Sequence, residues 1–194
     1  EELAELLAPE AGQTVIDIGS GVGGPSRYLA ATYGCHVSGV DLTQEFVDTA
    51  TALTALVGLS ERVRFRQGSA LDIPFPDASF DLAWSQNVAM NIEDRVRFYA
   101  EVHRVLKPGG RFAIQDVAMG NGQPLDFPVM WADRPEISFL RTPDDTRRML
   151  EAAGFSALHW IDNTEVAKAE AAAERARMGV EGAPTEPPIL RSEE

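Results

Sequence analysis

Short apolar runs rich in β-branched residues alternate with longer helical patterns through most of this chain. The runs expected to form strands are residues 14–18, 36–41, 63–67, 80–85, 111–117 and 157–162. Helical patterns separate most successive runs, as in proteins built from repeated strand–helix units. The sequence therefore predicts a three-layer α/β/α sandwich, in which helices cover both faces of a mostly parallel sheet.

Capping residues and prolines predict where the helices begin. Thr43 and Asn91 can each accept a backbone N–H at a helix start, and Pro143 suits a first helical turn. The helices expected on this basis cover about residues 25–33, 43–57, 91–106, 142–154 and 165–178.

Composition limits the class of protein and its partners. The chain has 194 residues, 44% of them hydrophobic and 24% charged, which is an ordinary balance for one globular core. Its formal net charge of −13 is spread along the chain and would repel nucleic acid and an anionic membrane surface. Cys35 is the single cysteine, which excludes an internal disulfide and fits a reducing compartment. We expect a cytoplasmic protein, and the oligomeric state stays open.

One domain is expected over residues 1–178. Residues 118–141 interrupt the strand–helix rhythm with prolines, glycines and aromatic residues, a composition typical of a binding loop or lid. Residues 179–194 contain a glycine- and proline-rich stretch and are expected to form an irregular tail. Because Glu1 already lies inside an amphipathic pattern, we expect a longer parent protein.

A glycine-rich turn joins the first expected strand to the first long helix. Gly19, Gly21 and Gly24 satisfy the G-x-G-x-x-G pattern of nicotinamide and flavin binders, a weak signal by itself. Asp17 stands two residues before the first glycine, where we expect its carboxylate at the mouth of the turn. A pyrophosphate would face a like charge there, whereas an ammonium and a sulfonium would be attracted. The turn therefore favours S-adenosylmethionine over a dinucleotide.

A second carboxylate follows at the end of the second expected strand. Asp41 stands roughly 20 residues beyond the first glycine, where a carboxylate can accept hydrogen bonds from both ribose hydroxyls. The alternative role is helix capping, which Thr43 fills better. We expect Asp41 to bind a ribose.

These segments resemble the motifs of the class I S-adenosylmethionine-dependent methyltransferases over about residues 3–162. Residues 15–23 look like the first motif of that family, and residues 71–81 and 106–111 look like the stretches before its fourth and fifth strands. The resemblance implies a Rossmann-like fold with S-adenosyl-L-methionine as cofactor. Residues 84–87 are most similar to sarcosine and dimethylglycine N-methyltransferases, and also to ubiquinone- and sugar-methylating enzymes. We expect the chain to lack the N-terminal helical cover and the last strand of that family, since no clear seventh strand pattern follows residue 162.

The resemblance also implies roles for individual residues. The carbonyls of Gly19 and Gln86 would hold the methionine ammonium, while Leu42 would cover the adenine face. The full expected cofactor site is Asp17, Gly19, Ser20, Gly21, Asp41, Leu42, Ser69, Ala70, Ser85 and Gln86. Many members of the family have aspartate where Ser69 stands and some have histidine where Asn91 stands, so the resemblance supplies no catalytic base.

Ligands of such folds lie beyond the carboxyl ends of the strands. The acceptor site is therefore expected to include Asn87, Met90, Asn91, Trp131 and Arg134. Arg134 or Arg141 can pair with a substrate carboxylate, with a solvated surface charge as the alternative. None of the three histidines stands near the glycine turn, so no catalytic residue and no metal site is predicted.

The expected function is methyl transfer from S-adenosylmethionine to a small-molecule acceptor. Amines are slightly favoured, because a neutral amine needs no general base. O- or C-methylation of a quinol, phenol or sugar stays open, as does a protein that binds S-adenosylmethionine without catalysis.

Overall fold

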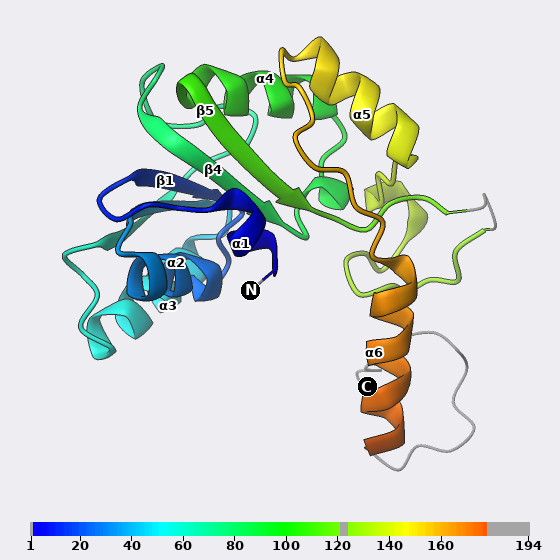
Figure 1. The fold of residues 1–194 in the computed structure, drawn as a ribbon. Coiled ribbons are helices and arrows are strands. Elements are labelled where there is room, and N and C mark those ends of the chain that lie inside the picture. Colours follow the sequence, from blue (N-terminus) through cyan, green and yellow to red (C-terminus); the bar gives the residue numbers. More distant parts are fainter. Residues whose placement is uncertain (1, 121–123, 178–194) are drawn as a thin grey trace. The chain divides into compact units, whose positions relative to one another are not determined.

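A computed structural model describes residues 2–120 and 124–177 (Figure 1). No described helix has the length and apolar character needed to cross a lipid bilayer. The strands are β1 (Thr14–Ile18), β2 (His36–Asp41), β3 (Val63–Gln67), β4 (Phe80–Gln86) and β5 (Leu106–Gln115). The α-helices are α1 (Glu2–Leu7), α2 (Gly24–Tyr33), α3 (Gln44–Leu56), α4 (Arg95–Val105), α5 (Pro143–Ala152) and α6 (Thr164–Arg177), with short 3-10 helices at η1 (Ala89–Asn91) and η2 (Pro135–Ile137).

The five strands form one parallel sheet in the order β3-β2-β1-β4-β5. Because β1 has β2 on one side and β4 on the other, the strand order reverses next to β1, where open sheets of this kind bind their ligands. The predicted α/β class and parallel sheet are confirmed. The fifth strand begins at Leu106, earlier than the predicted residue 111. Residues 107–110 belong to it as an irregularity opposite Asp81 in the β4–β5 ladder.

Helices cover both faces of the sheet (Figure 1): α4 and α5 lie on one face, and α1, α2 and α3 on the other. Strand side chains alternate between these faces. Ile16 and Ile18 of β1 belong to the apolar cluster that contains Phe98 of α4. Val15 belongs to the second cluster, with Leu29 of α2. The two faces therefore have separate cores on either side of one sheet.

The predicted sixth strand, residues 157–162, is wrong: this segment is irregular and exposed. Leu158 and Ile161 are 71% and 50% exposed. A strand needs a neighbour for its backbone groups, and within the described residues β5 forms a ladder with β4 alone. Apolar residues in this segment suggested a strand but could not supply that partner.

The chain divides into two compact units. The first unit, Glu1–Gly122 with Phe139–Ser156, contains the whole sheet and helices α1 to α5. The second unit is Gln123–Ser138 with Ala157–Glu194, and its described helices are η2 and α6. The domain limits expected from the sequence stay a prediction, and the expected tail, residues 179–194, lies outside the described residues.

The N-terminus of α4 differs from the prediction, because Asn91 does not cap it. Asn91 ends the 3-10 helix η1, in which its N–H donates to the carbonyl of Val88 at 3.0 Å. This extra turn delays the start of α4, and the Asp94 carboxylate accepts the N–H of Arg97 at 3.0 Å. The predicted cap of α5 is confirmed, since the Thr142 hydroxyl accepts the N–H of Asp145 at 3.1 Å.

Replacing the cap of α4 should lower stability measurably. We expect Asp94→Ala to reduce the free energy of unfolding by about 1 kcal/mol, the usual contribution of a side-chain cap. Urea denaturation followed by circular dichroism measures this difference. Asn91→Ala is the matched control, because that exposed side chain is not the cap, and its stability should stay within about 0.5 kcal/mol of the wild type. A larger loss in the control than in Asp94→Ala would contradict the assignment.

Candidate cofactor and acceptor site

The glycine turn follows β1 directly at the carboxyl edge of the sheet. The N–H groups of Gly19 and Ser20 donate to the carbonyl of Val40 on β2, at 2.8 and 3.1 Å. Gly19 and Gly21 have φ angles of 71° and 50°, in the left-handed region that favours glycine. Helix α2 begins at Gly24, immediately after the turn. The turn therefore presents bare backbone, together with the partly positive N-terminus of a helix.

Two neighbouring side chains explain which glycines the turn requires. A Cβ at Gly19 would overlap the methyl groups of Val88, and a Cβ at Gly23 would overlap the ring of Phe65. A Cβ at Gly24 would meet nothing within 4 Å. Of the two neighbours Gly23 and Gly24, only Gly23 is spatially constrained, so the G-x-G-x-x-G match through Gly24 is incidental to this turn.

Asp41 stands beside the turn, as its position at the end of β2 predicts. Its Oδ2 accepts the N–H of Gly21 at 2.8 Å, and its Oδ1 accepts the N–H of Thr43 at 2.9 Å. Thr43 occupies the N-cap position of α3, but its side chain makes no capping hydrogen bond. One carboxylate therefore links the turn to the start of α3. Each of its oxygens has a further lone pair for a ligand hydroxyl.

Asp17 lies under the turn, so the expectation of a carboxylate open at its mouth is wrong. The residue is 2% exposed, and its Oδ2 accepts the hydroxyl of Ser26 on α2 at 2.6 Å. The reason is the alternation along β1, which places Asp17 on the same face as Val15, toward α2. Burial raises the pKa of Asp17 to about 6, the Ser26 hydroxyl lowers it, and the nearby charge of Asp41 raises it.

Removing this buried charge should change how stability depends on pH. The pKa of Asp17 is higher in the folded chain than the ordinary 3.8, so its contribution to stability is lost as pH rises through about 6. Asp17→Asn keeps an oxygen for the Ser26 hydroxyl and cannot ionise. We expect its free energy of unfolding, relative to wild type, to rise by about 1 kcal/mol between roughly pH 5 and pH 7.

Urea denaturation of both proteins across that pH range measures the change. Asp81→Asn is the control, because the hydrogen bond from Lys107 lowers the pKa of Asp81 to about 2. Asp81 is therefore ionised throughout the range in both the folded and the unfolded chain, and its difference from wild type should stay constant. A constant difference for Asp17→Asn as well would contradict the raised pKa.

The structure also brings the expected adenine contacts to this edge. Leu42, directly after β2, is 71% exposed, unusual for a leucine beside a buried strand. The ends of β2 and β3 are tied together, because the N–H of Gly68 donates to the carbonyl of Asp41 at 2.9 Å. Ser69 and Ala70 follow that contact and are half-buried. The Ser69 hydroxyl accepts the N–H of Leu71 at 3.1 Å.

Unpaired hydroxyl groups occur where β1 and β4 end. The Oγ atoms of Ser20 and Ser85 are buried and have no hydrogen-bond partner among the described residues. Gln86, next along β4, donates from its side-chain amide to that of Gln115 at 3.1 Å. Buried polar atoms are normally paired, so these two hydroxyls are exceptions near the edge where the ligand is expected. With the bare turn, Asp41 and the exposed Leu42, these residues fit a nucleoside with a charged end.

The expected acceptor residues are divided between the two units. Asn87 and Asn91 are exposed after β4, whereas the side chain of Met90 is buried. Trp131 and Arg134 belong to the second unit, where the Trp131 indole N–H donates to Ser138 Oγ at 3.0 Å. The role of all five residues in acceptor binding stays a prediction.

Two charged residues near this edge were missed from the sequence. Asp116 directly follows β5, and its Oδ1 accepts the N–H groups of Val88 and Ala89 at 2.8 and 2.9 Å. It was missed because the fifth strand was predicted to run to residue 117, which placed Asp116 inside it. The second residue, Arg95, is only 3% exposed. For Asp116 the sequence did contain a signal, because it is an acidic residue at the end of an apolar run, as Asp41 is.

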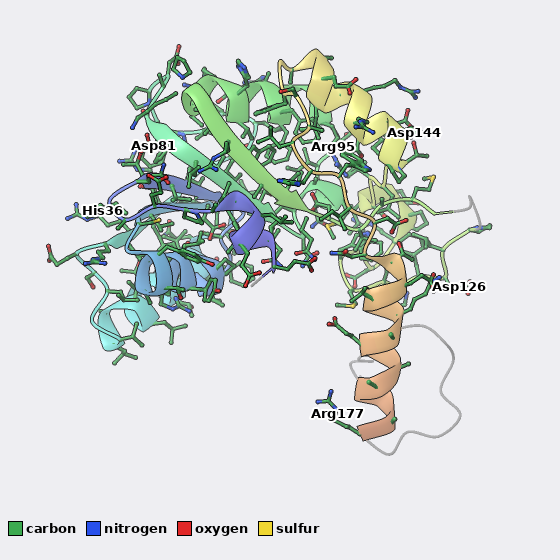
Figure 2. The ribbon with its side chains drawn as sticks, in the orientation of Figure 1. His36, Asp81, Arg95, Asp126, Asp144 and Arg177 are labelled. Atoms are coloured by element: carbon green, nitrogen blue, oxygen red, sulfur yellow. The ribbon has the colours of Figure 1, made fainter. Side chains whose placement is uncertain are left out.

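The histidines and carboxylates add no evident base or metal site. His36 begins β2 and lies with Asp81 at the amino-end edge of the sheet (Figure 2). His103 packs against the ring of Phe155 at a centroid distance of 5.3 Å. His159 lies in the irregular segment that replaces the predicted sixth strand. Among the residues the structure describes, no group of three or more His, Cys, Asp or Glu could hold a metal ion.

The strand order, the glycine turn and Asp41 together define a Rossmann-like cofactor-binding unit of the methyltransferase type. Comparison with protein families agrees, because the methyltransferase domain family matches residues 16–114. The chain belongs to the class I S-adenosylmethionine-dependent methyltransferases.

The names of individual relatives differ in the reaction that they describe. The probable tocopherol O-methyltransferase of Oryza sativa subsp. japonica is 41% identical over 118 residues, which are 59% of this chain and 33% of that protein. The sarcosine/dimethylglycine N-methyltransferase of Halorhodospira halochloris is 31% identical over 162 residues, 84% of this chain and 57% of that protein. The crystal structure of the [4+2]-cyclase SpnF matches with a TM-score of 0.76 at 29% identity, over 86% of this chain and 59% of that one. The chain thus spans less than two thirds of the length of each.

Proposed function

We propose that this chain binds S-adenosylmethionine and transfers its methyl group to a small-molecule acceptor, with an amine as the favoured class. The observation that carries the proposal is the placement of Asp41, whose carboxylate accepts the N–H of Gly21 and adjoins the exposed Leu42. One end of the site is thus anionic and polar, and the other is apolar. That combination suits a ribose joined to an adenine ring.

The described residues divide the work of binding. The cofactor supplies a methyl group bonded to a cationic sulfur. Gly19, Ser20 and Gly21 would hold its methionine end, and Asp41 would hold the ribose. Leu42 would cover the adenine, with Ser69 and Ala70 at its edge. The carbonyl of Gln86, at the end of β4, would help hold the methionine ammonium, and Ser85 would lie next to it. The buried Asp17 adds negative charge beneath the turn and favours a cationic ligand.

An amine acceptor is supported by the side chains near the carboxyl edge. Asn87 and Asn91 are exposed there and are not ionisable, while Asp116 has one carboxylate oxygen engaged by two backbone N–H groups and the other buried. A neutral amine attacks without losing a proton first, so alignment in a dry site supplies most of the acceleration. The similarity to a sarcosine/dimethylglycine N-methyltransferase supports the same class.

A second candidate is O-methylation of a phenol or quinol. It is favoured by the 41% identity to a probable tocopherol O-methyltransferase, although that match covers only 59% of this chain. A hydroxyl acceptor needs a general base, since its proton must leave as the methyl arrives. The two candidates therefore differ in one requirement: methylation of a hydroxyl needs a general base, and methylation of a neutral amine does not.

Calorimetry and a turnover screen test the proposal in sequence. Titration with S-adenosylmethionine, S-adenosylhomocysteine and NAD identifies the cofactor class. Release of S-adenosylhomocysteine is then measured with glycine, sarcosine, dimethylglycine, simple phenols and quinols. We expect binding of both sulfur nucleosides and turnover with an amine.

Each other result has a defined meaning. Turnover confined to phenols or quinols would favour the second candidate. Binding without turnover of any acceptor would indicate a protein that keeps the site without methylating these classes. Capture of NAD with no affinity for either sulfur nucleoside would overturn the proposal.

A further inference from the structure

Asp116 connects the end of β5 to the loop that follows β4. This loop, residues 87–91, is called the β4 loop below. One carboxylate oxygen, Oδ1, accepts two consecutive N–H groups, from Val88 at 2.8 Å and from Ala89 at 2.9 Å. Because β4 and β5 are neighbours in the sheet, this side chain bridges two segments that emerge side by side at the carboxyl edge.

The preceding residue strengthens the same connection. Asn87 has a φ angle of 58°, in the left-handed region that asparagine adopts more readily than most residues. Its N–H donates to the carbonyl of Gln115, the last residue of β5, at 2.8 Å. Three consecutive N–H groups of the β4 loop are therefore held by the end of β5.

The β4 loop in turn contacts the glycine turn. A Cβ at Gly19 would overlap both methyl groups of Val88, so the Val88 side chain lies directly against Gly19. A shift of the Val88 backbone would move its side chain toward or away from the turn. A continuous set of contacts thus runs from Asp116 through Val88 to Gly19.

The remaining features of Asp116 concern its charge. Its Oδ2 is buried and has no hydrogen-bond partner among the described residues. Burial raises the pKa of Asp116 to about 6, while the two N–H groups and the guanidinium of Arg95 lower it. Arg95 itself donates to the hydroxyl of Tyr99 and to the carbonyls of Ile92 and Phe139. The described contacts of Oδ1 need only an acceptor oxygen, which an amide also has.

We propose that Asp116 is a positioning residue, whose Oδ1 holds the β4 loop so that Val88 packs against Gly19 and shapes the cofactor site. The inference rests on the proposed function, because it assigns that site to S-adenosylmethionine. It requires the acceptor oxygen of Asp116 and not its negative charge. Asp116→Asn should therefore keep the two hydrogen bonds from Val88 and Ala89 that Asp116→Ala removes.

The experiment compares Asp116→Ala and Asp116→Asn with wild type by three measurements. These are amide hydrogen exchange at Val88 and Ala89 in the free protein, affinity for S-adenosylhomocysteine by calorimetry, and turnover. In Asp116→Ala we expect exchange at least ~tenfold faster and affinity weaker by ~threefold to tenfold, because two hydrogen bonds are lost. In Asp116→Asn all three measurements should return close to wild type. If the alanine variant does not fold, Asp116→Leu replaces it, because leucine also has no acceptor oxygen.

Asp81→Ala is the matched control. The Asp81 carboxylate also ties strands together, accepting the N–H of Thr14 at 2.9 Å and the ammonium of Lys107 at 2.7 Å, but at the opposite edge of the sheet. It should lose stability while keeping exchange at Val88 and affinity for S-adenosylhomocysteine.

Three outcomes would overturn the inference. The first is unchanged exchange and affinity in Asp116→Ala. The second is an asparagine variant that behaves like the alanine variant in exchange and affinity. The third is an asparagine variant that restores both but not turnover, which would assign the charge itself a chemical role. Failure of the proposed function is distinguishable, because wild type would then not bind S-adenosylhomocysteine, while exchange would still report whether the β4 loop is held.

Discussion

Gly21→Val is expected to weaken binding of S-adenosylmethionine by at least ~100-fold, equivalent to about 2.7 kcal/mol. A Cβ at Gly21 would meet no protein atom within 4 Å, so the new side chain would occupy open space above the turn. That space is where the proposed ligand approaches the backbone, next to the N–H that Asp41 accepts. The N–H itself is retained in the variant, so the expected loss comes from steric exclusion. Calorimetry with S-adenosylmethionine and S-adenosylhomocysteine measures it.

Backbone strain must be separated from exclusion of the ligand. Gly21 has a φ angle of 50°, which costs valine roughly 1–2 kcal/mol of folding stability. Gly12→Val is the matched control, because Gly12 has a φ angle of 84°, also meets no atom within 4 Å, and precedes β1 at the opposite edge. Both variants should lose similar stability, and only Gly21→Val should lose the ligand. Equal affinity in the two variants would remove the turn from the binding site.

Asp41→Ala is expected to weaken binding of S-adenosylmethionine by about 1–3 kcal/mol, or roughly 5- to 150-fold. The substitution removes the proposed acceptor for the ribose hydroxyls. It also leaves the N–H groups of Gly21 and Thr43 without their present partner, which loosens the turn and the start of α3. Both effects lower the affinity for S-adenosylmethionine, which calorimetry measures.

Two further variants separate these effects. Asp41→Asn keeps one acceptor oxygen and removes the charge, so its affinity should fall between those of wild type and Asp41→Ala. Asp48→Ala removes another carboxylate of the same region, on α3. Asp48 accepts a hydrogen bond from the side-chain amide of Gln44 at 2.7 Å, on its own helix. That control should bind as wild type does. Unchanged affinity in Asp41→Ala would remove the ribose assignment.

Most of the sheet was predictable because its signals are local. The strands at residues 14–18, 36–41 and 63–67 have the predicted limits, since each is a short run with a strand-like apolar pattern, bounded by turn residues. The start of α4 was less predictable. Asn91 and Asp94 are both good capping residues, and the hydrogen bonds of η1 decide between them. The segment at residues 157–162 shows the limit of pattern alone, because a strand also requires a neighbouring strand.

The candidate site was predictable where sequence order and strand topology coincide. Gly19 and Gly21 lie in the turn after β1, and Asp41 ends the neighbouring β2, so their meeting at one edge follows from a parallel sheet. Predicting the burial of Asp17 required knowing which face of β1 packs against α2. Predicting the place of Asp116 required knowing where β5 ends. A small difference in strand length decides whether this side chain lies within the strand or at the edge of the sheet.

The amino-acid sequence by itself determined the class of fold, the largely parallel arrangement of its strands and the glycine turn that follows the first of them. These depend on periodicity and on glycine and capping preferences, which act over a few neighbouring residues. Only the tertiary structure decided that Asp17 is buried, that residues 157–162 form no strand, and that Asp116 holds the β4 loop against Gly19. Burial, strand pairing and hydrogen bonds of this kind depend on partners far away in the chain, and local patterns contain no information about which partner will be present.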